Sequence, residues 1–119
     1  MSIMNDQAII DVLIIEPGQP PRRDGIPNTL EAMQHVVGGY IEHIGSDDHA
    51  SCWVNEEGRL INLPPNRILI RPDGTIADIL RGPILITGHD PDTGEETSLS
   101  DEQAERYARL FAGPAVTVA

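Results

Sequence analysis

The chain has 119 residues, a single cysteine and a formal net charge of −11. This length suits one domain with a modest aliphatic core. No apolar run approaches the roughly 20 residues that span a bilayer, and one cysteine excludes an internal disulfide, so we expect a cytoplasmic protein without a membrane partner. The negative charge disfavours direct binding to nucleic acid, because carboxylates repel phosphates.

The first part of the chain predicts a strand, a loop and a helix. Residues 8–15 are rich in Ile, Val and Leu, which indicates a buried strand. Three prolines and two glycines predict a loop over residues 16–25. In the helix that follows, Asn28 is the predicted N-cap and Glu31 completes a capping box. A pair of glycines at 38–39 ends this helix, because glycine adopts the left-handed cap without steric cost.

The middle of the chain predicts mostly extended structure. Residues 40–44 and 50–55 have the pattern of two strands in an antiparallel meander. Residues 64–67 contain two prolines and predict an interruption. The pattern then predicts an extended segment at 68–71, a single helical turn at 77–81 and a buried strand at 83–87.

A second helix is predicted near the C-terminus. Ser100 is its N-cap and Gln103 closes a capping box. Its packing stripe consists of Ala104, Tyr107, Ala108 and Phe111. The predicted fold is therefore a small single α+β domain over residues 8–113, with a mostly antiparallel sheet packed by two helices. Residues 1–7 are predicted to be disordered and residues 114–119 to form a flexible tail.

No motif in the chain predicts catalysis, a cofactor or a metal site. No two of the four histidines have the helical spacing that zinc sites use, and one cysteine cannot build a cysteine cage. The segment from Asp90 to Glu96 superficially resembles a calcium loop. Gly94, however, stands where the third oxygen ligand of such a loop is required. We therefore expect no catalytic residues, no metal ligands and no cofactor.

Two groups of residues are candidates for binding. The first is a run of carboxylates without an intervening arginine: Asp90, Asp92, Glu95, Glu96, Asp101, Glu102 and Glu105. Such a run either keeps the protein soluble or imitates a phosphate backbone and occupies a nucleic-acid-binding protein. The second group gathers hydrogen-bonding side chains around two turns: Asn55, Asn62, Asn66 and Arg67. These residues would bind a small ligand, with the arginine holding an anionic group.

The chain resembles a family known as domain of unknown function 3846, which occurs in bacteriophages, plasmids and bacteria. The resemblance rests on residues 26–42, 55–58, 63–67 and 98–103, and it extends over roughly residues 11–111. It brings no established catalytic residues. What it implies is an accessory protein of a mobile genetic element.

From these observations we expect a non-enzymatic accessory protein that binds and inhibits a host defence component. The partner would be a host protein that processes nucleic acid, such as a CRISPR effector or a restriction enzyme, bound through the acidic surface. The alternative is a small-ligand binder that sequesters a nucleotide-type signal. Whether a second copy of the chain also binds is left open.

Overall fold

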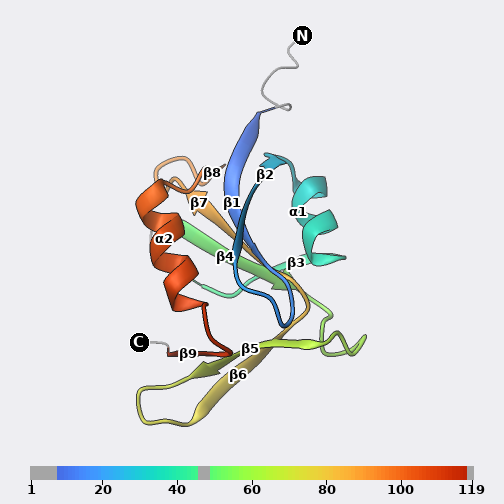
Figure 1. Ribbon diagram of the computed structural model, residues 1–119. Coiled ribbons are helices and arrows are strands. Elements are labelled where there is room, and N and C mark those ends of the chain that lie inside the picture. Colours follow the sequence, from blue (N-terminus) through green and yellow to red (C-terminus); the bar gives the residue numbers. More distant parts are fainter. Residues whose placement is uncertain (1–7, 46–48, 118–119) are drawn as a thin grey trace.

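Two β-sheets and two helices make up the computed structural model, which describes residues 8–45 and 49–117 (Figure 1). The predicted α+β domain with a mostly antiparallel sheet is confirmed. In chain order the elements are β1 (Ile9–Ile15), β2 (Arg22–Pro27), α1 (Leu30–Val37), β3 (Ile41–His43), β4 (Ala50–Asn55), β5 (Pro65–Ile70), β6 (Ile76–Arg81), β7 (Ile84–His89), β8 (Glu96–Thr97), α2 (Asp101–Leu110) and β9 (Ala115–Thr117).

The larger sheet has the strand order β2-β1-β7-β4-β3, and β8 adds to the end of β7. All of its strand pairs are antiparallel. Residues Ile84 to Gly88 of β7 are all buried, because helices cover both faces of this sheet (Figure 1). A strand enclosed on both faces has an uninterrupted apolar sequence, which is why residues 83–87 were recognisable as a strand.

Two apolar clusters lie on opposite faces of the larger sheet, because neighbouring side chains of a strand point in opposite directions. Val12 and Ile14 of β1 pack toward α1, in a cluster with Met33 and Val37. The other cluster takes Leu13 and Ile15 of β1, and it includes α2 residues and the smaller sheet. Its remaining members are Ala50, Cys52, Val54, Leu80, Ile84, Ile86, Leu99, Ala104, Tyr107, Phe111 and Val116.

The smaller sheet has the order β6-β5-β9 and lies at the lower end of the molecule in Figure 1. Strand β9 pairs with β5 in parallel, and Val116 is only 2% exposed. The prediction of a flexible tail at 114–119 is therefore wrong for residues 115–117. Pairing with β5, some 45 residues earlier, orders them, and no local pattern reveals such a pairing. Residues 1–7, 46–48 and 118–119 lie outside the described part of the chain.

Three further local predictions are wrong. Residues 22–25, predicted as loop, belong to β2, an edge strand whose residues are largely exposed and so lack an apolar pattern. Residues 77–81 form β6 rather than a helical turn, because they pair with β5 across a hairpin. Residues 65–67, within the interruption predicted at 64–67, are instead the start of β5. Pro65 is the first residue of that strand, a position where proline is tolerated.

The helix ends follow their capping residues, with one correction. Helix α1 is capped by Thr29 and not by Asn28: the Thr29 side chain accepts a hydrogen bond from the Ala32 backbone amide at 3.1 Å. The side-chain amide of Asn28 instead donates to the backbone carbonyl of Glu96. Gly38 ends α1 with φ of 82°. At α2, the capping box of Ser100 and Gln103 is present as predicted.

Candidate functional site

Most of the predicted acidic residues gather at one end of the molecule. They lie in the turn between β7 and β8 and in the first half of α2, which are neighbours at the upper left of Figure 1. We call this set the acidic end: Asp90, Asp92, Glu95, Asp101, Glu102 and Glu105. All except Asp90 are exposed. The two carboxylates in the first turn of α2 also face the positive end of the helix dipole, which stabilises them there.

One ion pair partly neutralises the acidic end. Arg23 of β2 contacts Asp101, with 2.5 Å between nitrogen and oxygen. The hydrogen bond to Asp101 raises the pKa of Arg23, and the nearby charges of Asp11 and Glu105 raise it further. Asp11 of β1 therefore contributes to the same negative field. The sequence analysis missed it, because Asp11 lies some 80 residues from the run of carboxylates.

Glu96 does not belong to this surface, contrary to the sequence prediction. Its side chain is 13% exposed and is bound within the protein. The Thr87 hydroxyl donates to Oε1 of Glu96 at 2.6 Å, and Trp53 Nε1 donates to the same hydroxyl oxygen at 3.1 Å. Glu96 lies on β8, and pairing with β7 turns its side chain toward the sheet.

His89 and Glu96 form a pair that the sequence analysis did not anticipate. Nδ1 of His89 lies 2.9 Å from Oε2 of Glu96. A carboxylate in this position orients an imidazole, as it does in general-base sites. Among the described residues, however, no hydroxyl or thiol makes a hydrogen bond to the other ring nitrogen of His89. Within the same residues, no group of three His, Cys, Asp or Glu is placed to hold a metal ion.

The predicted ligand-binding pair of Asn66 and Arg67 lies inside the fold. Arg67 is 4% exposed. Its guanidinium donates to the carbonyl oxygens of Phe111 at 3.0 Å and Gln19 at 2.7 Å, and to both oxygens of Asn66. The Asn66 amide donates in turn to the carbonyls of Ile15 and Gly82, each at 2.8 Å. These bonds join β1, the loop after it, β5 and the end of α2.

Burial lowers the pKa of Arg67, because a desolvated guanidinium loses hydration. The Phe111 carbonyl is at the C-terminus of α2, where the helix dipole is negative and compensates part of this cost. A cavity of about 330 Å³ adjoins Arg67 and is lined by residues 18–20 and 112–114 as well. Four of the five donors of the guanidinium are already bound to protein carbonyls. The arrangement therefore stabilises the junction between the sheets.

Asn55 and Asn62 do not line the cavity that adjoins Arg67. The buried Asn55 amide donates to the Val37 carbonyl at 3.2 Å, and its side-chain oxygen accepts from the Glu57 amide at 2.7 Å. Asn62 is exposed in the loop before β5 and has φ of 55°, a conformation that asparagine tolerates. The four residues thus do not converge on one pocket.

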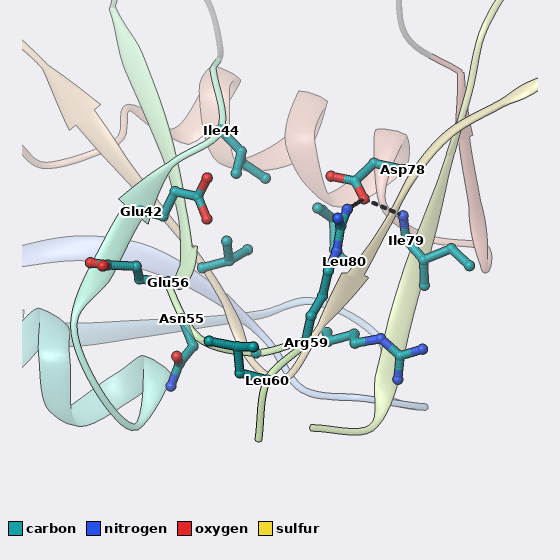
Figure 2. A pocket seen from close by; sticks show the side chains of 12 residues that line it. Glu42, Ile44, Asn55, Glu56, Arg59, Leu60, Asp78, Ile79 and Leu80 are labelled. Atoms are coloured by element: carbon teal, nitrogen blue, oxygen red, sulfur yellow. Dashed lines mark hydrogen bonds and ion pairs between the residues drawn. The ribbon is translucent and has the colours of Figure 1, made fainter. Parts of the chain in front are cut away.

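A cleft that the sequence analysis did not identify lies between the two sheets (Figure 2). We call it the inter-sheet cleft; it has a volume of about 340 Å³. Strands β3 and β4 line one side, β6 lines the other, and residues 58–60 close one end. Asn55, a candidate from the sequence, and the adjacent Glu56 both line it. The residues opposite them, 78–81, were expected to be helical, so their approach could not be foreseen.

Fold and surface together define a small α+β protein with a charged end and an open cleft. The chain belongs to the family described as domain of unknown function (DUF3846), whose model matches residues 10–112. This confirms the resemblance noted in the sequence. No curated protein and no solved structure matches the chain. Neither α1 nor α2, the helices of the described residues, has the length and apolar character needed to cross a bilayer.

Proposed function

We propose that this protein is a non-enzymatic accessory protein that binds a basic partner protein through the acidic end. The observation that carries the proposal is the concentration of charge. Five exposed carboxylates from a turn and an adjacent helix lie at one end of the molecule, and Arg23 pairs with only one of them. The formal net charge of −11 adds a long-range attraction for a basic partner.

The partner class follows from this charge. Carboxylates presented on a rigid helix and turn can take the place of nucleic-acid phosphates in a groove lined by arginine and lysine. The protein would then compete with nucleic acid for the same groove. We propose that the partner is a nucleic-acid-processing protein of a bacterial host, of the anti-CRISPR or anti-restriction target type, and that binding takes place in the cytoplasm. A phage or other mobile element as the source is part of the same proposal.

An affinity capture from bacterial lysate tests this proposal. The bait is compared with a charge-reversed variant, Glu95→Arg/Glu102→Arg, which changes one carboxylate of the turn and one of α2. The matched control is Glu31→Arg/Glu57→Arg, which changes net charge equally at two exposed positions outside the acidic end.

We expect wild type and control to retain a nucleic-acid-binding protein that the Glu95/Glu102 variant loses. Because the contact is between charges, retention should also fall steeply as salt is raised. Equal retention by all three baits would contradict the proposal, and so would the recovery only of proteins without affinity for nucleic acid.

A further inference from the structure

The inter-sheet cleft has the features of a binding site and uses no residue of the acidic end. One face of the larger sheet is covered by α2 and by the smaller sheet. At the β3 edge this covering leaves an opening, and the free edges of β3 and β6 stand on its two sides. At about 340 Å³, the cleft is at the lower end of the range for ligand pockets. It is large enough for one long side chain.

Part of the wall of the cleft is apolar. Val54 of β4 and Leu80 of β6 are core residues that also line it, and Ile44, just beyond β3, packs against the same cluster. A ligand in the cleft would therefore contact aliphatic surface on several sides. An inorganic ion or a fully hydrated small molecule would gain little from these contacts.

The rim of the cleft carries carboxylates that have no partner within the described residues. Glu42 of β3 points into the cleft in Figure 2, whereas Glu56 also lines the cleft but directs its carboxylate away from it. Neither carboxylate makes a hydrogen bond or an ion pair in residues 8–45 and 49–117. In contrast, Asp78 on the far side is held by Arg59 and by the Ile79 backbone amide. Arg81, which also lines the cleft, donates to the Leu63 carbonyl and has no carboxylate partner within the described residues. The two free carboxylates outnumber this one cation, so the free charge of the lining is negative and suits a cation.

The loop that closes one end of the cleft exposes large apolar side chains. Leu60 lines the cleft and is 83% exposed, and the adjacent Ile61 is 54% exposed. A contiguous exposed apolar patch can mark a protein-binding surface, and Leu60 and Ile61 are adjacent in the chain. A metal ion or a polyamine would leave them uncovered. A polypeptide that places a cationic side chain in the cleft would cover them with its neighbouring residues.

We propose that the inter-sheet cleft receives an arginine side chain of a partner protein, next to an apolar partner residue that covers Leu60 and Ile61. The aliphatic stem would pack on Ile44, Val54 and Leu80, since long cationic side chains bury their stems and keep the charge at the rim. The guanidinium would bind Glu42, and the exposed Glu56 would add to the negative field around it. Arginine suits this rim better than lysine, because its planar group can donate two hydrogen bonds to one carboxylate and is more weakly hydrated.

Backbone-amide NMR of the full chain tests the proposal with three short probes. These are the blocked dipeptides acetyl-Arg-Leu-amide, acetyl-Lys-Leu-amide and acetyl-citrulline-Leu-amide; the last keeps the shape of arginine without its charge. We expect the arginine probe to shift amides of residues 42–44, 54–60 and 78–81 with a millimolar Kd. We expect weaker binding of the lysine probe and none of the citrulline probe.

Two variants with matched controls locate the contact. Glu42→Gln should weaken the arginine probe about threefold to tenfold, whereas Glu31→Gln, on exposed α1 surface, should leave it unchanged. Leu60→Ala should also weaken binding, and Leu110→Ala, exposed on α2, should not. All four positions are at the surface, so the fold is retained.

Several outcomes would overturn the proposal. These are shifts centred on α2 instead of the cleft, equal binding of the citrulline probe, lysine binding as tight as arginine, or no shifts at millimolar probe. None of them bears on the acidic end, whose partner is tested separately by the lysate capture.

Discussion

Replacing Arg67 by alanine tests whether this side chain holds the two sheets together or is free for a ligand. The guanidinium donates to carbonyl oxygens of Gln19, Asn66 and Phe111, which come from three segments distant in the chain. Alanine removes all of these bonds at once. If the side chain holds the sheets together, the alanine variant should lose much of the free energy of unfolding. If the side chain is free for a ligand, the variant should be almost as stable as the wild type.

The size of the loss follows from opposing terms. A buried carbonyl left without its donor costs about 1–3 kcal/mol. Three backbone carbonyls lose a donor. Water can enter from the adjoining cavity of about 330 Å³ and donate hydrogen bonds to some of them. Removing the charge also recovers its desolvation cost, which is several kcal/mol for a buried ion. We therefore expect Arg67→Ala to lower the free energy of unfolding by about 3 kcal/mol.

Urea unfolding followed by circular dichroism measures this loss. The control is Arg71→Ala, just after β5, where an exposed arginine donates to Thr75 and to the Ile76 carbonyl. It should cost less than about 1 kcal/mol, because water replaces those bonds. Arg67→Lys should also be destabilised, since one ammonium cannot reach all the acceptors. Equal midpoints for the two alanine variants would refute the reasoning.

Three further changes probe separate parts of the fold. Ser100→Ala removes the cap of α2 and should lower the free energy of unfolding by about 1 kcal/mol in a urea titration. An unchanged midpoint would show that the cap is dispensable. Val116→Ala should cost about 1–3 kcal/mol because the side chain is buried, whereas the neighbouring exposed Thr117→Ala should cost almost nothing. Similar small losses would mean that β9 is not held in the core. Burial raises the pKa of Cys52 to about 12, against 9.0 for a free thiol. The Cys52 thiol therefore ionises at lower pH in the unfolded chain than in the folded one. As a result, the free energy of unfolding should fall between pH 9 and 12, by about 1.4 kcal/mol at pH 10. Cys52→Ala should lack this component, and identical pH profiles would contradict the assignment.

The elements predicted from sequence are those whose signals are local. The capping box at Ser100 and Gln103 and the glycine at position 38 are decided within a few residues, so both helices were located. Residues Ile84 to Ile86 are apolar without interruption because both faces of β7 are covered. Strand β9 has three residues and depends on pairing with β5, so its sequence carries no sufficient signal. The exposed edge strand β2 lacked an apolar pattern for a similar reason.

The candidate sites, too, were predictable only where their signals are local in the sequence. The acidic end was predictable because its carboxylates are close in sequence and α2 is well defined. Glu96 was misassigned because pairing of β8 with β7, rather than local charge, directs its side chain. The acceptors of Arg67 lie 44 and 48 residues away in sequence, so its structural role could not be inferred from the turn around it. The inter-sheet cleft likewise exists only where residues 42–60 and 78–81 meet.

The central claim is that the acidic end occupies the nucleic-acid groove of a basic partner. The most direct measurement is a competition experiment with the purified partner recovered by affinity capture and its labelled nucleic acid, followed by fluorescence anisotropy. We predict that the wild-type protein and Glu31→Arg/Glu57→Arg displace the nucleic acid, and that Glu95→Arg/Glu102→Arg does not. A ternary complex in which partner, nucleic acid and wild-type protein remain bound together would contradict the claim.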